Sequence, residues 1–253
     1  DLLSLQAGVV SSGSDLHFRG GRSGQVAYQI DGVPLTDAYD GSAVINVNAN
    51  AVQELQVISG AFNAEYGQAM SGIINIVTKD GSNSLNGNFQ TYIGDYFSSR
   101  DDKFWDIKDI NPVAIRNFEG SLSGPILQDQ LFFYVNGRYY YNTGYLYGKR
   151  NFLVTDRASE IAGSGGSDFN ITQNGDNSFV SMNPNEKLYG QGKLTYRLLP
   201  GVKVNFNYVL DREEYQDYYH SRRLTPDNNL QRFRKGYSNI LSLNHAVSNS
   251  SFY

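Results

Sequence analysis

The residues of this chain that could do acid–base or metal chemistry are three histidines and a short run of carboxylates. The histidines lie far apart and in none of the spacings of a metal-binding motif: His17, His220 and His245. Asp211, Glu213 and Glu214 could suggest a carboxylate pair for glycoside hydrolysis, but closely spaced charges where a strand enters a loop usually form a solvated rim. The sequence therefore predicts no catalytic residue, no metal site and no cofactor, and a protein that is not an enzyme.

Aromatic side chains in long polar segments are better candidates for binding a ligand. An aromatic ring stacks on a sugar or holds a peptide side chain while its polar edge stays hydrated. The candidates fall in two segments and are Phe104, Trp105, Tyr215, Tyr218, Tyr219 and His220. Residues 215–219 could equally extend an aromatic band at a membrane surface.

Composition narrows the class of protein that must position these residues. The net charge is −4 with acids and bases interspersed, which excludes nucleic acid as a partner. No run approaches the roughly 18 apolar residues of a membrane-spanning helix, so a bilayer crossing would have to use strands. The chain has no cysteine but 26 Gly, 19 Tyr and 14 Phe, a composition typical of β proteins.

From residue 85 onward, apolar and polar residues alternate with a period of two. Segments with this pattern are 85–97, 118–126, 131–141, 187–198, 202–210 and 233–247. In the fourth segment one face carries Leu188, Leu194, Tyr196 and Leu198, and the other carries Lys187, Gln191, Lys193, Thr195 and Arg197. This alternation predicts strands with one apolar and one polar face.

The connections between these segments alternate in length. Tight turns are expected at 128–130, 200–201 and 248–250, and long polar loops at 98–116, 148–185 and 216–230. Such sorting is typical of an outer-membrane barrel with periplasmic turns and mobile extracellular loops, whereas a soluble carbohydrate-binding sandwich has no reason for it. Aromatic girdles are then expected near Tyr139 to Tyr141 on the outer side and at Phe132 and Phe133 on the periplasmic side.

Up to about residue 80 the pattern differs, with short apolar runs broken by Gly, Asn and Asp. Strands are expected at 26–30, 53–58 and 72–78, with a tight hairpin turn at Asp31-Gly32. The sequence thus predicts two domains: a compact α/β unit over 1–80 and a β domain over 81–253.

Six motifs in order give the first unit a family resemblance. Residues 2–10 resemble a helix leading to a PGV-type turn, here Ala7-Gly8-Val9, and residues 17–20 (HFRG) resemble an IRG strand. YQIDGVP, VQELQVISG, AEYG and SGIINIVTK then begin at Tyr28, Val52, Ala64 and Ser71. Together they resemble the plug of the TonB-dependent receptors. SGPI at Ser123 and LFFY at Leu131 resemble the Oar-like branch of that family.

The resemblance implies a mainly β protein, in which a small α/β plug precedes part of an antiparallel transmembrane barrel of about 22 strands. Six or seven of those strands are expected in this chain. Arg19, Arg22 and Asp31 would dock the plug against the polar wall residues Lys187, Lys193 and Arg197. Asp37 and Tyr39 would lie at a plug apex and join Trp105, Tyr215, Tyr218 and Tyr219 as ligand-binding candidates.

The resemblance also implies a location in the Gram-negative outer membrane and active import of an oligosaccharide, peptide or chelate. Expected partners are outer-membrane lipid, a TonB-type energy-coupling protein bound by a segment expected before Asp1, and a surface lipoprotein or envelope complex. The alternative is a structural or assembly subunit that keeps the receptor fold without transport.

Overall fold

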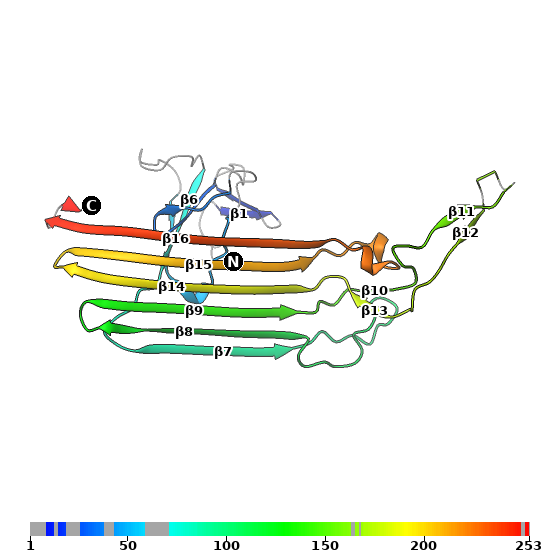
Figure 1. The fold of residues 1–253 in the computed structure, drawn as a ribbon, viewed down its shortest axis with the longest axis horizontal. Coiled ribbons are helices and arrows are strands. Elements are labelled where there is room, and N and C mark those ends of the chain that lie inside the picture. The colour runs from blue at the N-terminus through cyan, green and yellow to red at the C-terminus, as the bar shows by residue number, and fades with distance from the viewer. Residues whose placement is uncertain are drawn as a thin grey trace.

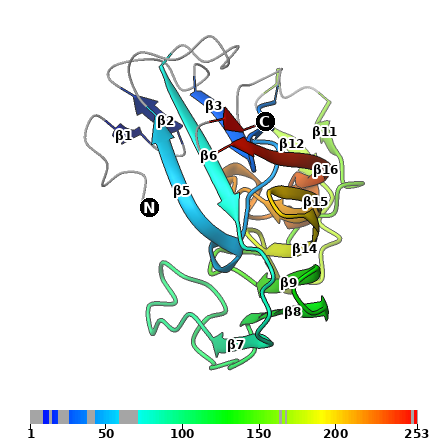
Figure 2. The ribbon, with the colours of Figure 1, turned by 90° about the vertical axis from the view of Figure 1, so that its left-hand side faces the viewer.

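The computed structural model describes residues 9–12, 15–18, 26–37, 43–58, 71–162, 165–166, 168–248 and 251–252. Two sheets dominate it. A seven-stranded antiparallel sheet, which we call the wall, has the order β17-β16-β15-β14-β9-β8-β7. A four-stranded mixed sheet, the small sheet, has the order β4-β3-β6-β5 and lies against one face of the wall (Figures 1 and 2). The architecture is mainly β, as the sequence predicts.

The wall strands follow the expected alternating segments. They are β7 Asn86–Gly94, β8 Ile115–Leu127, β9 Leu131–Asn142, β14 Asn185–Leu199, β15 Val202–Gln216, β16 Gln231–Ser248 and β17 Ser251–Phe252. The predicted turns at 128–130 and 200–201 lie at one end of the wall, the turn end, and the three long connections at the other, the loop end (Figure 1). The predicted sorting is confirmed for these connections, whereas residues 249–250 of the third expected turn lie outside the described residues.

The two faces of the wall differ as the alternation predicts. On β14 Leu188 and Leu194 are exposed, whereas Gln191, Lys193 and Thr195 are buried beneath the small sheet. A face that covers polar side chains and exposes leucine is inverted relative to a soluble sheet. The outward face is apolar, and the inward face is polar and occupied.

The predicted girdles need two corrections. Phe132 is fully buried on the inward face, and its ring lies 4.7 Å from the guanidinium carbon of Arg197. Tyr140 also points inward, where its hydroxyl accepts a hydrogen bond from Asn142 at 3.0 Å. Period-two geometry explains both: neighbouring residues point to opposite faces, so only one of Phe132 and Phe133 can face outward.

The small sheet is built from β3 Val26–Ile30, β4 Val33–Pro34, β5 Val52–Ile58 and β6 Gly72–Thr78. The β3–β4 hairpin turns at Asp31 and Gly32, whose φ angles of 50° and 81° fit the predicted tight turn. Strands β3 and β6 pair in parallel. A 3-10 turn, η3 Ala49–Ala51, leads into β5.

The α part of the expected α/β unit has no counterpart among the ranges described above. Residues 2–8 of the helix expected over 2–10 lie outside them, and Val9 and Val10 instead begin β1 Val9–Ser12, which pairs with β2 Asp15–Phe18. No helix in the described part of the chain has the length and hydrophobicity needed to cross a membrane.

An apolar contact joins the two sheets. Ile30 and Ile45 from the small-sheet region pack with Tyr189, Val209 and Ile240, one from each of β14, β15 and β16. These side chains are almost completely removed from solvent. Because the burial of each large apolar side chain contributes about 1.5–3 kcal/mol, this contact supplies much of the cohesion between the sheets.

The long connections contain structure of their own. β10 Tyr147–Lys149 pairs with β13 Phe179–Ser181, and β11 Ala158–Glu160 with β12 Phe169–Ile171 in a hairpin that projects from the loop end (Figure 1). Two 3-10 turns, η4 His220–Arg222 and η5 Pro226–Asn228, follow β15. Of the glycine-rich segment 163–167, the described residues are 165 and 166.

Candidate functional site

A buried ionic network joins the small sheet to the wall. Lys193 of β14 is 5% exposed, and its Nζ lies 3.2 Å from Oδ2 of Asp31 and 2.7 Å from Oδ1 of Asp80. Lys203 of β15 forms a second ion pair with Asp80. Two ammonium groups and two carboxylates therefore balance. We call this set, with Thr78 and Asn207, the junction network.

Hydrogen bonds with the uncharged groups of Thr78 and Asn207 complete the network. Oδ1 of Asp31 accepts from the Thr78 backbone N–H at 2.8 Å, and its Oδ2 accepts from the Thr78 hydroxyl at 2.7 Å. The same Oδ2 accepts from Asn207 Nδ2 at 2.9 Å. Lys193 Nζ donates to Thr78 Oγ1 at 3.0 Å. A buried charge is tolerated when it is paired and hydrogen-bonded, and Asp31 and Lys193 meet both conditions.

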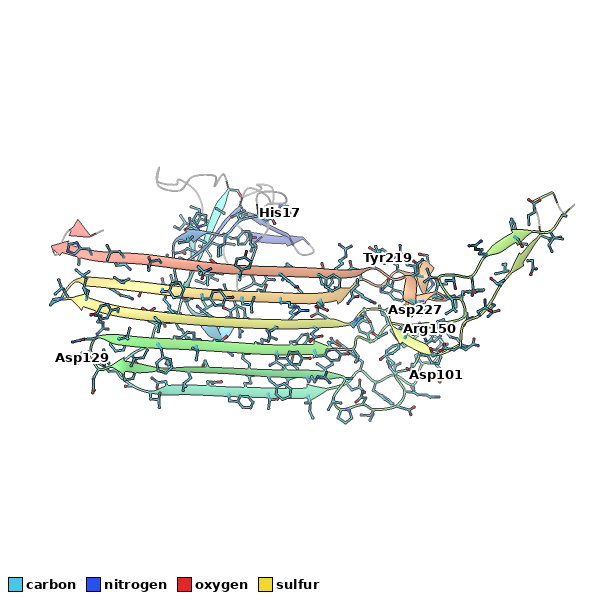
Figure 3. All side chains as sticks on the ribbon, viewed as in Figure 1. His17, Asp101, Asp129, Arg150, Tyr219 and Asp227 are labelled. Carbon is cyan, nitrogen blue, oxygen red and sulfur yellow. The ribbon has the colours of Figure 1, made fainter. Side chains whose placement is uncertain are left out.

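The linker from β6 to β7 is held at further points. A Cβ added at Gly81 would lie 2.3 Å from the carbonyl oxygen of Phe133 and 2.8 Å from Cβ of Phe132, so the linker backbone rests directly on β9. Asn83 donates to Asp129 Oδ1 at 2.6 Å and accepts from the Asp129 backbone N–H at 2.8 Å. Asp129 lies at the turn end (Figure 3).

Nearer the loop end, the small-sheet region contacts the wall mostly through hydrogen bonds. In these bonds uncharged N–H groups of the small-sheet region donate to carboxylates of the wall. Asn48 Nδ2 donates to Glu119 Oε1 at 2.7 Å and to Asn136 Oδ1 at 3.0 Å, and Asn50 also donates to Glu119. The Asn46 backbone N–H donates to Asp211 Oδ2 at 3.2 Å. Ionic docking is therefore concentrated on the turn-end side.

The pKa of Asp80 gives the junction network a predicted pH dependence. Burial alone would raise it, but the ammonium groups of Lys193 and Lys203 outweigh burial and hold the pKa of Asp80 below its usual value. A depressed carboxylate pKa stabilises the folded state above the unfolded pKa, and that stabilisation is lost as pH falls through the folded value.

We therefore expect protection of the β6 amides from hydrogen exchange, corrected for the intrinsic pH dependence of exchange, to be flat from pH 8 to pH 5. It should fall below about pH 4, the ordinary range of an aspartate. Asp80→Asn should weaken protection at neutral pH and flatten the acid response. An unchanged acid response in this variant would show that other carboxylates control it.

A second candidate site is a cavity of about 190 Å³ at the loop end, which we call the loop pocket. All three long connections contribute to it. Its lining residues are Asp102, Lys103, Phe104, Trp105, Tyr145, Leu146, Tyr147, Tyr218, His220 and Arg223. Five aromatic rings and several polar edges therefore face one space, a combination suited to a ring-shaped group with hydroxyl or amide substituents.

Contacts within the lining fix these rings. The guanidinium of Arg223 lies 5.5 Å from the centre of the Trp105 ring, and Phe104 packs against Tyr145 at 6.3 Å. Tyr218 and His220 share a hydrogen bond of 2.9 Å between the hydroxyl and Nδ1. A lining that is already ordered loses little conformational entropy on binding.

The second and third connections are locked together beside this pocket. Arg150 binds Asp227 through Nε at 2.6 Å and Nη2 at 2.9 Å, and its Nη1 binds Asp176 at 3.1 Å (Figure 3). The hydrogen bond with Asp227 is the main reason why the pKa of Arg150 is raised above its ordinary value. A bidentate pair between a guanidinium and a carboxylate fixes orientation as well as distance.

The structure brings together some of the predicted site residues and separates others. Asp31 meets Lys193, whereas Lys187 pairs with Glu213 of the adjacent wall strand at 2.8 Å and Arg197 lies on Phe132. Among the described residues, the ion-pair partner of Lys187 and the aromatic partner of Arg197 thus lie within the wall, whereas the small-sheet region meets β14 at Tyr189 and Lys193. Arg19 and Arg22 lie outside the described residues.

Among the ligand-binding candidates, Trp105 and Tyr218 line the loop pocket. Tyr219 instead lies beside Arg222, 5.2 Å from its guanidinium carbon, and the backbone of Tyr215 pairs with Arg232 on β16. Asp37 follows the β3–β4 hairpin and is not among the residues that line this pocket, and Tyr39 lies outside the described ranges. In the described part of the chain, no three His, Asp or Glu side chains gather as metal ligands.

Sequence reasoning missed Thr78, Asp80, Lys203 and Asn207. The period-two pattern already places Lys203 and Asn207 on the inward face, so a search for inward-facing polar residues would have found both. Asp80 carries no such signal, since it follows the last strand of the small sheet in an irregular linker.

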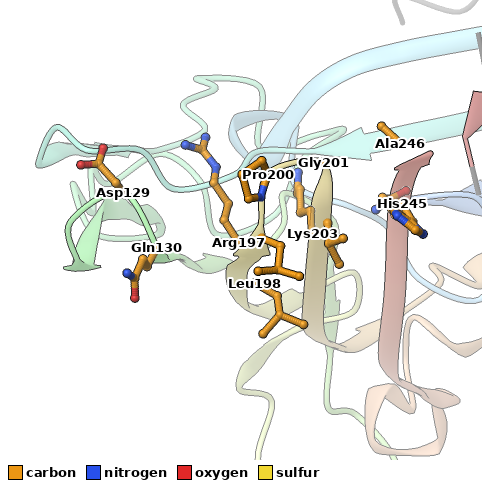
Figure 4. A pocket seen from close by; sticks show the side chains of 12 residues that line it. Asp129, Gln130, Arg197, Leu198, Pro200, Gly201, Lys203, His245 and Ala246 are labelled. Carbon is orange, nitrogen blue, oxygen red and sulfur yellow. The ribbon is translucent and has the colours of Figure 1, made fainter. Parts of the chain in front are cut away.

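A larger cavity of about 590 Å³ lies at the turn end, lined in part by Asp129, Arg197, Lys203 and His245 (Figure 4). Its remaining lining comes mostly from the β14–β15 turn, with Leu198, Leu199 and Val202. Arg197 and Lys203 already have partners in Phe132 and Asp80. The cavity therefore offers less free binding capacity than its size suggests.

The fold and its interface define a class: a small sheet held against the polar inner face of an antiparallel wall with an apolar outer face, the arrangement of a plugged barrel. Comparisons with known proteins agree. Residues 1–73 match the family model described as TonB-dependent Receptor Plug Domain. The TonB-dependent transporter Oar of Myxococcus xanthus is 27% identical over 139 residues, which is 53% of this chain and 13% of that protein.

Solved structures show the same fold. The FrpB iron transporter of Neisseria meningitidis aligns with a TM-score of 0.60 at 13% identity over 98% of this chain and 35% of its own. The transporter YddB of Escherichia coli gives 0.59 at 11% identity over 92% and 31%. The siderophore receptor PirA of Pseudomonas aeruginosa gives 0.55 at 19% identity over 94% and 32%. The chain spans about a third or less of each of these relatives.

The chain therefore resembles the TonB-dependent receptors, and residues 1–73 match their plug. The small sheet corresponds to part of the plug, and the wall has the fold of barrel strands. The relatives found are receptors and transporters.

Proposed function

We propose that this chain is part of an outer-membrane transporter that imports a ligand through a plug-gated barrel. One observation carries the proposal: the same wall strands expose apolar side chains outward and bury polar ones under the plug. TonB-dependent receptors are outer-membrane proteins of Gram-negative bacteria, and the proposed location follows from the resemblance to them. A TonB-type coupling protein would supply the energy.

The proposed orientation places the loop end outside the cell and the turn end in the periplasm. On β14 the outward apolar residues run from Leu188 to Leu198. At about 3.3 Å per residue and about 40° of tilt, this stretch covers roughly 25 Å, the height of the apolar band of an outer-membrane barrel. The loops then reach the medium, and the junction network lies toward the periplasm.

Labelling of adjacent cysteines tests this orientation. Lys187 and Leu188 are neighbours on β14 with 40% and 43% exposure. A reagent would therefore reach both positions if no membrane covered the wall. In membranes we expect Lys187→Cys to react with a water-soluble thiol reagent and Leu188→Cys to be protected. The chain has no cysteine of its own to give background. Protection of position 187 with reaction at 188 would reverse the proposed faces.

The loop pocket is the proposed site of first ligand contact. Its volume of about 190 Å³ is below the roughly 300–1,000 Å³ of pockets that enclose a whole small molecule, so it suits one ring or side chain of a larger ligand. The related proteins FrpB and PirA are described as an iron transporter and a siderophore receptor. An oligosaccharide, a peptide and a metal chelate all present groups of this kind.

Trp105→Ala tests the pocket. Once a screen of ferric chelates, oligosaccharides and peptides on the full-length protein has identified a ligand, this variant should weaken binding by about 2 kcal/mol, roughly thirtyfold in Kd. Phe169→Ala, an exposed aromatic on the β11–β12 hairpin, is the matched control and should bind normally. Equal effects of the two changes would exclude the pocket. Membrane insertion with no uptake of any candidate would favour the assembly-subunit alternative.

A further inference from the structure

The guanidinium of Arg150 joins two of the three connections that line the loop pocket, although Arg150 itself is not in the lining. Arg150 follows β10 in the second connection, and Asp227 lies in η5 of the third (Figure 3). Their bidentate pair is partly shielded from water, with side chains 26% and 37% exposed. Salt screens such a pair less than a fully exposed one, so it can hold the two connections at a fixed separation.

The remaining nitrogen of this guanidinium binds within the second connection. Nη1 of Arg150 donates to Oδ2 of Asp176 at 3.1 Å and to the hydroxyl of Ser178 at 2.7 Å. One planar group thus binds both connections at once, and its donors point in fixed directions. A lysine ammonium has the same charge but lacks this rigid set of donors.

Backbone contacts beside the bidentate pair place Arg223 of the third connection. The N–H of Lys149 donates to the carbonyl oxygen of Arg223 at 2.7 Å, and the N–H groups of Asn151 and Phe152 donate to that of Leu224 at 3.1 and 3.0 Å. A Cβ added at Gly148 would lie 2.7 Å from the same Arg223 oxygen. The backbone of Arg223 therefore rests directly on the second connection.

The first connection meets the other two in a different way. Among the described residues, no hydrogen bond or ion pair joins residues 98–113 to the second or third connection. Ring contacts join them instead: Trp105 lies 6.2 Å from Phe179 and 5.5 Å from the guanidinium carbon of Arg223. The position of Arg223 over Trp105 is therefore set mainly by the second connection.

We propose that Arg150 is a positioning residue for ligand binding, which through Asp227 fixes where Arg223 and His220 lie in the loop pocket. The inference rests on the proposed function, because it treats the loop pocket as the site of ligand contact. Asp176 has no such role, since it and Arg150 belong to the same connection. The two carboxylates bound by one guanidinium are thus expected to differ in their effect on the pocket.

The test compares D227N with D176N in the full-length receptor, because the two changes remove the same charge from the same guanidinium. Hydrogen exchange of the amides of 149, 151 and 152 measures the junction between the connections. We expect protection of these amides to fall roughly tenfold in D227N and in R150Q. It should fall less than about threefold in D176N, whose pair is more exposed. R150Q/D227N should lose no more than R150Q, since both changes break one contact.

The fluorescence of Trp105 reports on the pocket without any ligand. Subtracting the spectrum of the matching W105F protein isolates this ring, and acrylamide quenching measures its exposure. Quenching should rise in D227N and R150Q but not in D176N. R150K keeps the charge and should not restore the parent value. G148A leaves every charge in place but crowds the Arg223 backbone, so it should raise quenching by an independent route.

Equal effects of D227N and D176N, full restoration by R150K, or normal Trp105 quenching in both D227N and G148A would each overturn the proposal. So would a loss of protection in D227N that extends equally to the β11–β12 hairpin, because that result indicates general loosening of the loops. None of these measurements needs a ligand. Failure here therefore removes the role of Arg150 alone, whereas normal binding by Trp105→Ala removes the loop pocket as the ligand site.

Discussion

Lys193→Met is expected to weaken attachment of the plug to the barrel by about 3–5 kcal/mol, because breaking a buried ion pair from one side leaves an uncompensated charge. Lys193 is 5% exposed and contacts both Asp31 and Asp80. Asp80 keeps Lys203 in the variant, whereas Asp31 loses the cation of its ion pair and keeps, among the described residues, its hydrogen bonds with Thr78 and Asn207. Asp31 should therefore be the origin of most of the loss.

Hydrogen exchange of the β3 and β6 amides in the full-length protein measures this effect, since both strands should open more often. Lys187→Met is the control: it removes a lysine from the same face of β14, but its pair with Glu213 is 40% exposed on the lysine side and lies wholly within the wall. That change should cost no more than about 1 kcal/mol. Similar small effects of both substitutions would contradict the prediction that the junction network stabilises attachment of the plug to the wall.

Asp31→Asn combined with Lys193→Met refines the assignment. If the two side chains act through each other, the double variant should lose less than the sum of the single losses, with a coupling energy of about 0.5–3 kcal/mol. Additive losses would mean that Lys193 acts mainly through Asp80.

Gly81→Ala is expected to displace the linker between plug and barrel. The new Cβ would lie 2.3 Å from a backbone oxygen of β9, and backbone cannot rotate away as a flexible side chain can. Overpacking of this kind costs about 1–3 kcal/mol or more. Because Asp80 is the preceding residue, the shift should also draw its carboxylate away from Lys193 and Lys203.

The yield of assembled protein in the outer membrane and hydrogen exchange at residues 79–85 measure the effect. Gly190→Ala on the outward face of β14 is the matched control, since no atom lies within 4 Å of the added Cβ. It should assemble normally. Normal assembly and unchanged linker exchange in Gly81→Ala would show that the linker has more freedom than this close contact indicates.

The sequence by itself determined the features of the fold that depend on local rules. Period-two alternation assigned Leu188 and Leu194 to one face and Lys193 to the other, since successive strand residues must point in opposite directions. Asp31-Gly32 marked a hairpin because few dipeptides adopt positive φ at both positions. The lengths of the connections indicated that the tight turns lie at one end of the wall and the long loops at the other. Each of these signals lies within a few residues of its consequence.

Only the tertiary structure decided which of several equivalent residues meet. Lys187, Lys193 and Arg197 share one face of β14, but among the described residues only Lys193 of the three forms an ion pair with the plug. Trp105 and Tyr218 converge on one pocket, and Tyr219, the next residue, does not line it. The physical reason is that such contacts depend on how far one sheet is translated along another. That offset is fixed by packing of side chains distant in sequence, which no local pattern records.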